Sequence, residues 1–385
     1  MSSYALTPPS LRTLFAATIL ATLLFAAGCD RDGGNAKSAG GEGANSSSKV
    51  KIGIIGLTCE APLFVAYEKG FFKEEGVEVE LVKADWKTLA DSLGLGKLDA
   101  THTLVMYVLK PIEQGADLKM TAGVHKGCLR IQAGTKTPIK TLQELKGKRI
   151  GIPNMGSPPH MFASRVLAAN GIDPSKDVTW RTFPPQEQGM ALDKGEIDAV
   201  ATSEPIGTML LRTDKVRNVV DQAVDAPYKD EYCCAVVVNG KFASRDPAAA
   251  AKVTRAILKG AKWVQTNPTA AAQLSVEKKH LACNPELNAQ ALSKLTYIPS
   301  VAGGRDATGL AAEEMKKAKL LSPTTDVAQL SKRAFLPLEG VTDEWLGGLK
   351  VEQVAGGGPA PEITPEQFVS LVEKGGHKPC CQAIK

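Results

Sequence analysis

The sequence has little net charge, few aromatic side chains and few histidines. Its 46 Lys and Arg residues nearly balance 41 Asp and Glu residues, so the formal net charge is only +5, and aromatic residues occupy 5% of the 385 positions. Because the basic residues are scattered, the chain lacks the basic patch typical of nucleic-acid-binding proteins. The segment GLGKLD (94–99) lacks the spacing of a phosphate-binding loop, and no Ser/His/Asp or Cys/His catalytic arrangement emerges. The composition therefore indicates neither a nucleic-acid partner nor an enzyme.

The N-terminus has an apolar run that is too short for a comfortable membrane span. It has the three parts of a secretory leader: Arg12 as its only charge, the apolar run over 14–27, and FAAGC ending at Cys29. Residues 26–29, AAGC, resemble a bacterial lipobox, in which the chain is cut before an acylated cysteine. We therefore expect a lipoprotein signal peptide over residues 1–28 and a lipid on Cys29 that holds the protein in the cell envelope, on the periplasmic or outer face of a membrane. In the alternative, an ordinary secretory leader, Cys29 has no role.

The composition after the leader changes to Gly, Ser, Ala and Asn. Residues 29–48 cannot bury enough apolar surface to fold, which predicts a flexible tether. The 8 cysteines of the chain would suggest disulfides in an exported protein. If Cys29 carries lipid, an odd number remains, so at least one thiol is free, metal-bound or paired between molecules. The remaining cysteines are Cys59, Cys128, Cys233, Cys234, Cys283, Cys380 and Cys381.

Two segments of the chain repeat each other. KIGIIGLTCEAPLF (51–64) is echoed by RIGIPNMGSPPHMF (149–162), and GKLDA (96–100) by GEIDA (195–199). Each second copy starts about 100 residues after the first, which indicates two lobes of the same kind. The apolar patterns predict strands at 49–55, 77–82, 99–103, 149–153, 178–183 and 198–203, and helices at 62–72, 86–95, 158–170, 187–195 and 205–213.

These patterns predict an α/β fold with mostly parallel strands, whose ligands lie beyond the carboxyl ends of the strands. The loops expected there are 57–61, 101–104, 154–159 and 202–205. Long helices follow, the clearest at 246–268, and EYCCAVVV (231–238) is expected to be the strand that returns from the second lobe. The predicted boundaries are 49–135 with 236–335 for lobe 1, 136–235 for lobe 2, and 336–385 for a C-terminal extension.

Several segments over residues 50–280 resemble one known family. They include APLFVAYEKGFFKEEGVEVELVKADWKTLADSLGLGKLDA, LQELKGKRIGIPNMGSPPHMFASRVLAANGIDPSKDV, LDKGEIDAVATSEP and DPAAAAKVTRAILKGAKWVQTNPTAAAQLS. They are similar to the nitrate/sulfonate/bicarbonate/thiamine-pyrimidine (taurine-like) family of substrate-binding proteins of ABC importers. The resemblance implies a type II periplasmic-binding-protein fold, hinge closure on a small solute, a permease and an ATPase as partners, a monomer, and no catalysis or resident cofactor.

The resemblance leaves the ligand open. An organic anion or oxyanion is favoured, a thiamine-pyrimidine-type ligand and a metal are the alternatives, and a metal ion bound together with the ligand is a further option. A different class is an enzyme similar to the pyrimidine-phosphate synthases of this fold, to whose cysteine-rich motif YCC (232–234) bears a partial likeness. The export leader argues against that enzyme, because such biosynthesis needs cytosolic cofactors.

The expected cleft loops carry residues suited to an anion. Ser157 and the Gly156 amide are expected at one helix N-terminus, with Thr58 and Cys59 at the corresponding place in the first lobe, where backbone N–H groups favour negative charge. In the alternative these residues only cap their helices. Further candidates are His102 and Thr103 after a strand, Trp86 as a stacking surface, Met155, Glu60 and Glu204.

The two carboxylates admit three interpretations. Glu60 and Glu204 either cap helices, or accept hydrogen bonds from an organic ligand, or join a metal. Cys59, Cys128 and Cys233/Cys234 lie in three separated regions that the fold brings together, and with His102 they form a soft ligand set for copper or zinc. The metal-ligand candidates are Cys59, His102, Cys128 and Cys233; in the alternative, these cysteines are small hydrophobes of the core. Strand alternation predicts that Cys233 and Cys234 face opposite sides.

Overall fold

The computed structural model describes residues 49–364, 366–367 and 370. The expected signal peptide, Cys29, the tether and residues 371–385 therefore lie outside the described residues. Within the described part of the chain, no helix is both long and apolar enough to cross a membrane.

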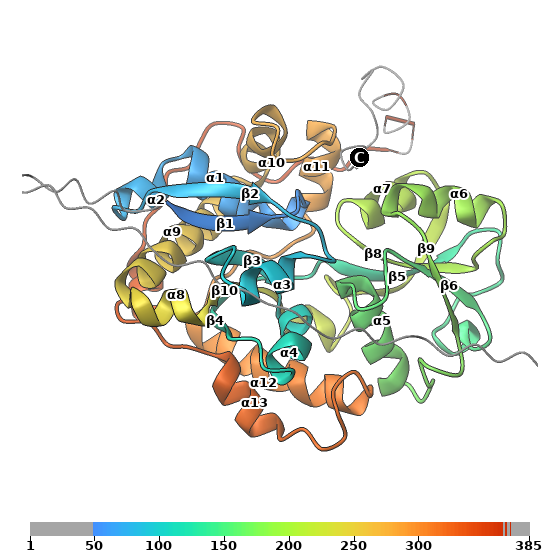
Figure 1. Cartoon of the computed structure of the whole chain (residues 1–385). Coiled ribbons are helices and arrows are strands. Elements are labelled where there is room, and N and C mark those ends of the chain that lie inside the picture. The colour runs from blue at the N-terminus through green and yellow to red at the C-terminus, as the bar shows by residue number, and fades with distance from the viewer. Residues whose placement is uncertain (1–48, 365, 368–369, 371–385) are drawn as a thin grey trace, which may run out of the picture. The chain divides into compact units, whose positions relative to one another are not determined.

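The first sheet has the strand order β2-β1-β3-β10-β4 (Figure 1). Strand β1 pairs in parallel with β2 and β3, whereas β10 is antiparallel to both β3 and β4. The return strand β10 thus closes the sheet as the sequence predicts. The strands are β1 (Val50–Ile54), β2 (Val79–Lys83), β3 (Ala100–Leu104), β4 (Leu118–Lys126) and β10 (Tyr232–Asn239).

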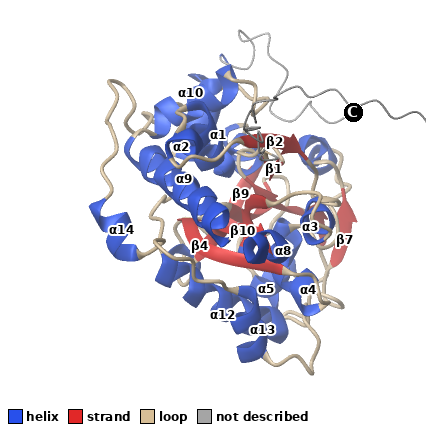
Figure 2. Cartoon of the chain, turned by 60° about the vertical axis from the view of Figure 1, so that its left-hand side comes forward, coloured by secondary structure: helices blue, strands red, loops and turns tan. Residues whose placement is uncertain are grey.

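Helices cover both faces of the first sheet. On one face α1 (Ala61–Glu68) and α2 (Phe71–Glu74) pack against α9 (Pro247–Thr266). On the other, α12 (Val301–Lys317) packs on β4 and against α4 (Val105–Glu113) and α13 (Val327–Ala334). Figure 2 shows α9 and α12 on opposite sides of β4. Because both faces are covered, β10 is buried from Cys233 to Asn239, and its apolar run predicts that burial.

The second sheet repeats this arrangement with the order β7-β6-β8-β5-β9. Strand β6 is parallel to β7 and β8, and β5 is antiparallel to β8. The repeated sequence segments occupy corresponding strands, since KIGI forms β1 and RIGI forms β6, which confirms two lobes of one kind. The strands are β5 (Leu129–Gly134), β6 (Arg149–Ile152), β7 (Thr179–Thr182), β8 (Ala199–Ser203) and β9 (Val216–Asp221); the helices are α5 (Pro158–Ala169), α6 (Gln188–Asp193) and α7 (Ile206–Arg212).

The crossings between the sheets fall earlier than the predicted boundaries. Strand β5 (129–134) pairs with β8 and β9 in the second sheet, although the boundary at 135/136 assigns it to lobe 1. Strand β10 begins at Tyr232 in the first sheet, whereas the boundary at 235/236 assigns its first residues to lobe 2. Backbone pairing therefore places the crossings at 127–128 and 222–231, and they determine which side chains lie beside the hinge.

The described part of the expected C-terminal extension packs on the first lobe. The Leu336 amide donates to Met120 O over 2.8 Å, and the Val354 amide donates to Asn267 Oδ1 over 2.8 Å. The remaining helices are α3 (Leu89–Gly94), α8 (Gly240–Arg245), α10 (Pro268–Glu277), α11 (Pro285–Leu292) and α14 (Asp343–Gly348), with 3-10 turns at Thr58–Glu60, Gln143–Leu145, Pro185–Glu187 and Tyr228–Asp230.

Candidate ligand-binding site

Four free thiols meet where the chain crosses between the sheets. Cys59 follows β1, Cys128 lies in the turn between β4 and β5, and Cys233 and Cys234 open β10. Their exposed fractions are only 2, 3, 5 and 1% in that order. Cys283 is disulfide-bonded, and Cys29, Cys380 and Cys381 lie outside the described residues. The sequence expectation that three regions bring thiols together thus matches their placement here.

Cys128 differs from the other three thiols in the direction of its pKa shift. Bonds from the Cys233 and Cys59 side chains, together with the Glu204 backbone amide, lower the pKa of Cys128 well below its ordinary value. The hydrogen bond with Cys128 raises the pKa of Cys59, and burial raises the pKa values of Cys233 and Cys234. Cys128 is therefore the most acidic of the four thiols.

Two histidines of the first sheet adjoin the thiols. The rings of His102 on β3 and His125 on β4 lie edge to face with centroids 5.3 Å apart, and the Tyr297 ring is 5.1 Å from His125. Neither ring nitrogen of His102 has a hydrogen-bond partner, and Nε2 of His125 has none. Burial lowers the pKa of both imidazoles, so both rings are neutral. Tyr297 closes this side by hydrogen bonding to Cys59 O over 3.3 Å.

One subset of these side chains has the spacing of a metal site. One ligand atom each from Cys59, His125 and Cys234 lies within 4.8 Å of the others, and all three residues are buried. Of the metal-ligand candidates from the sequence, Cys59 belongs to this subset, while His102, Cys128 and Cys233 lie beside it. Both sulfurs of Cys233 and Cys234 lie in the cluster, 4.0 Å apart, so the expectation of opposite faces fails.

The two acidic candidates are engaged by the protein itself. The Glu60 carboxylate accepts hydrogen bonds from the backbone amides of Ile55, Gly56 and Leu57, at 2.6–2.9 Å for the shortest bond to each. Burial nevertheless raises the pKa of Glu60 to about 7. Glu204 is ion-paired with Arg130 and accepts from the Thr208 hydroxyl over 2.9 Å. Of the three interpretations of Glu60 and Glu204, these contacts match the first, in which the carboxylates bond to the protein itself.

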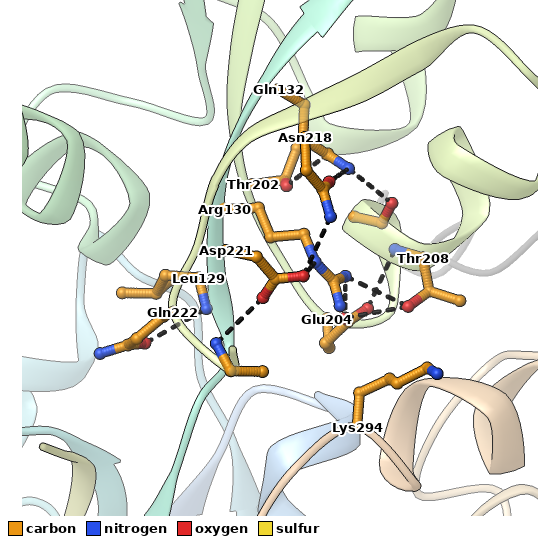
Figure 3. Close-up of polar contacts among 12 residues, drawn as sticks. Leu129, Arg130, Gln132, Thr202, Glu204, Thr208, Asn218, Asp221, Gln222 and Lys294 are labelled. Carbon is orange, nitrogen blue, oxygen red and sulfur yellow. Dashed lines mark hydrogen bonds and ion pairs between the residues drawn. The ribbon is translucent and has the colours of Figure 1, made fainter. Parts of the chain in front are cut away.

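Arg130 organises a buried polar network that the sequence reasoning missed. Its Nε donates to Asp221 Oδ2 over 2.7 Å, and its Nη1 donates to Glu204 (Figure 3). The side chains of these three residues are at most 9% exposed. Arg130 sits on β5, Asp221 ends β9 and Glu204 follows β8, so the network ties three elements of the second sheet beside Cys128. The sequence does carry a signal for this network, because LRIQAG places an Arg and a Gln within an otherwise apolar strand.

The predicted anion loop of the second lobe has few donors to offer. The Gly156 amide donates to His160 Nδ1 over 3.2 Å, and the Ser157 amide and hydroxyl both bond to Asn154 O. Helix α5 then begins with Pro158 and Pro159, which carry no N–H group. Met155 at the tip of the loop is 58% exposed. The Gly156 and Ser157 amides are thus engaged by the chain itself.

The other first-lobe candidates divide into engaged and unengaged groups. The Thr58 hydroxyl donates to Asn288 Oδ1 over 2.7 Å, and the Trp86 ring packs edge-on against Tyr107 at 5.1 Å. Thr103 is buried and its hydroxyl has no partner. His102 and Thr103 both lie on strand β3. Their neutral side chains have no partner within the protein and are therefore left to hydrogen-bond a solute.

Two five-stranded sheets, each mostly parallel and joined by two crossings, define the periplasmic-binding-protein fold. The alkanesulfonate-binding protein SsuA from Xanthomonas axonopodis pv. citri, bound to MOPS, superposes with a TM-score of 0.61 at 19% identity over 73% of this chain and 97% of that one. A ligand-binding component of an ABC-type import system from Staphylococcus aureus, with zinc bound, gives 0.61 at 20% identity over 75% and 96%. These likenesses confirm the predicted fold.

The chain belongs to the NMT1-like family, whose model matches residues 43–277. It is also 26% identical over 240 residues to the nitrate/nitrite binding protein NrtA of Nostoc sp. (strain PCC 7120), a match that covers 56% of this chain and 54% of that protein. The chain therefore spans about half the length of the curated relatives it matches. The predicted family resemblance is confirmed.

Proposed function

We propose that this chain is the solute-binding component of an ABC importer, held on the periplasmic or outer face of a membrane by a lipid on Cys29, with a permease and an ATPase as partners. The observation that carries the proposal is the architecture: two sheets of the same kind are joined by crossings at 127–128 and 222–231. Two covered sheets joined by two crossings can close on a solute like a hinge. The chain itself catalyses no reaction.

The solute that we propose is a small organic anion or oxyanion. The nitrate-binding relative and the sulfonate-binding structure support this class by their names. In the first lobe, the buried side chains of His102 and Thr103 lack hydrogen-bond partners, and a bound oxyanion would satisfy their donors. Arg130 does not serve as the anion's counter-charge, because Glu204 and Asp221 already neutralise it.

Thermal unfolding of the purified full chain with added solutes tests this function. Nitrate, bicarbonate, alkanesulfonates and a pyrimidine are added separately, each with and without chelator. A solute at one hundred times its dissociation constant should stabilise the chain by about 2.7 kcal/mol. His102→Phe, which removes both ring nitrogens, should weaken the response, whereas His160→Asn, remote on α5 of the second lobe, serves as the matched histidine control.

The possible outcomes distinguish three claims: that the chain binds a solute, that the solute is an anion, and that it binds at His102. A response to an oxyanion or sulfonate that His102→Phe weakens supports both the class of ligand and its position. A response to the pyrimidine alone overturns the anion and keeps a solute-binding protein. No response to any of these solutes would overturn the solute-binding function as proposed.

A further inference from the structure

Three buried side chains from separate parts of the first lobe converge with the chemistry of a soft metal site. Cys59 comes from the turn after β1, His125 from the end of β4, and Cys234 from the start of β10. One ligand atom from each lies within 4.8 Å of the other two. The sulfur–metal and nitrogen–metal bonds of such sites are about 2.0–2.3 Å long, so small side-chain movements would bring all three atoms onto one ion.

His125 has one ring nitrogen that the protein leaves without a partner. Its Nδ1 lies 3.4 Å from the Lys126 carbonyl oxygen, whereas its Nε2 is buried and has no hydrogen-bond partner. An Nδ1–H group that donates to a carbonyl leaves the lone pair on Nε2, which is the arrangement that orients metal-binding histidines. A buried nitrogen without a partner is costly, and a metal bond would satisfy it.

We propose that Cys59, His125 and Cys234 bind one thiophilic metal ion of the zinc or copper(I) class. Two thiolates and a neutral imidazole balance the charge of a divalent ion, which suits a buried place. Cys128 and Cys233 adjoin the set, because Cys128 bonds to Cys59 and Cys233 Sγ lies 4.0 Å from Cys234 Sγ. These two are the further thiols next to the three ligands.

Hard ions such as magnesium and calcium do not fit this place. They require several oxygen ligands. The carboxylate nearest in sequence, Glu60, is occupied by three backbone amides, and Glu204 is occupied by Arg130 and Thr208. The atoms left for a ligand are sulfur and imidazole nitrogen, which select soft or borderline ions.

Packing alone does not account for the cluster. Buried cysteines can serve as small hydrophobes, but an imidazole without partners on Nε2 does not behave as one. His102, whose ring is 5.3 Å from His125, also has two unpartnered nitrogens. One ion would satisfy Nε2 of His125 and engage the thiols beside it at the same time.

The test uses the full chain, purified in reductant without oxygen and freed of metal by a chelator. Zinc, copper(I) and magnesium are titrated separately against a competing indicator, and native mass spectrometry counts the ions bound. We expect one zinc or copper(I) ion per chain and none of magnesium. Cobalt(II) in the same place should give the thiolate-to-cobalt charge-transfer absorption that a site without sulfur lacks.

Single variants then assign the ligands. Cys59→Ser, His125→Asn and Cys234→Ser should each weaken metal binding at least tenfold, whereas His160→Asn, a buried histidine of the second lobe, should leave it unchanged. Circular dichroism checks that each variant folds. If a variant does not fold, the thiolate-to-cobalt absorption of the unaltered chain gives the answer instead.

The proposal is overturned if the reduced chain binds neither zinc nor copper(I) in stoichiometric amount, or if both serine variants bind as tightly as the unaltered chain. It does not depend on the transport function, because the metal alone is the probe. A chain that binds zinc but no anion would keep this site and reject the proposed solute.

Discussion

The sulfur atoms of Cys233 and Cys234 lie 4.0 Å apart although the two residues are neighbours in one strand. A regular strand would send the two side chains to opposite faces. The pairing of β10 with β4 shifts register between Tyr232 and Cys234 and again between Cys234 and Ala235. This irregularity turns both sulfurs toward the same cluster. Strand β10 therefore contributes two thiols to the cluster instead of one.

The burial of the four clustered thiols predicts slow alkylation. Cys59, Cys128, Cys233 and Cys234 are each at most 5% exposed, so a reagent reaches them only when the structure opens. We expect iodoacetamide to label these cysteines at least one hundred times more slowly in the native chain than in urea. Peptide mass spectrometry after timed quenching measures each site, and native labelling as fast as in urea would contradict the buried cluster.

Arg130 should be one of the most costly side chains to remove. It is ion-paired with both Glu204 and Asp221 in the interior, and removing one partner of a buried ion pair typically costs about 3–5 kcal/mol. We expect Arg130→Gln to lower the free energy of unfolding by about that amount. Urea denaturation followed by circular dichroism measures the change.

Arg149 provides the matched control in the same sheet. It pairs with Asp198 over 2.7 Å, but its side chain is 37% exposed. Solvent screens an exposed pair, so Arg149→Gln should change stability little. Equal losses in the two variants would show that the burial of Arg130 does not set its contribution.

Gly304 marks a close approach between helix α12 and strand β4. A Cβ atom there would lie 2.1 Å from the Gly123 backbone nitrogen and 2.7 Å from the Ala122 carbonyl carbon, neither of which can move like a side chain. We expect Gly304→Ala to lower the free energy of unfolding by about 3 kcal/mol, the upper end of the range for overpacking. Denaturation in urea measures the loss.

Gly309, in the same helix, separates the clash from the effect of the residue type. A Cβ at Gly309 would meet only Ser331 Oγ, at 4.0 Å. Gly309→Ala should therefore stabilise the chain by up to about 1 kcal/mol through helix propensity. If both alanine variants behaved alike, the close approach of α12 to β4 would be wrong.

The fold could be predicted from the sequence because its signals are local and repeated. The Lys/Arg-Ile-Gly-Ile segments and the two Gly-x-x-Asp-Ala segments each begin or precede a buried strand, and those strands occupy corresponding places in the two sheets. The crossings were less accurate. An apolar strand such as β5 fits either sheet until its hydrogen-bond partners are known, and those partners are more than 60 residues away in the chain.

The candidate site was predicted only in outline. Topology brings Cys59, Cys128 and β10 together, but the sequence gives no indication of the irregular pairing that turns Cys233 and Cys234 to one side. Tyr297 reaches Cys59 across 238 positions of the chain from a loop with no recognisable pattern. For Glu60 and Ser157 the sequence leaves helix capping and ligand contact open, and local backbone groups engage both side chains in the structure.

His160 should make the chain less stable in acid. Its Nδ1 accepts a hydrogen bond from the Gly156 amide over 3.2 Å, and burial lowers its pKa from 6.5 to about 4. The folded state therefore keeps the ring neutral while the unfolded chain takes up a proton at pH 6.5, so this stability is complete above pH 6.5 and is lost as the pH falls toward 4. At the acid end the loss amounts to roughly 3 kcal/mol.

The variant His160→Asn isolates this contribution, because asparagine places an acceptor oxygen near the position of Nδ1 and does not titrate. Every other titrating group is common to both proteins, so their difference in unfolding free energy belongs to position 160. Urea denaturation between pH 7 and pH 4 should show the unaltered chain losing roughly 3 kcal/mol more than the variant, chiefly below pH 6.5. Parallel curves across that range would mean that the ring is protonated as readily in the folded chain as in water, which contradicts its burial between α5 and Trp180.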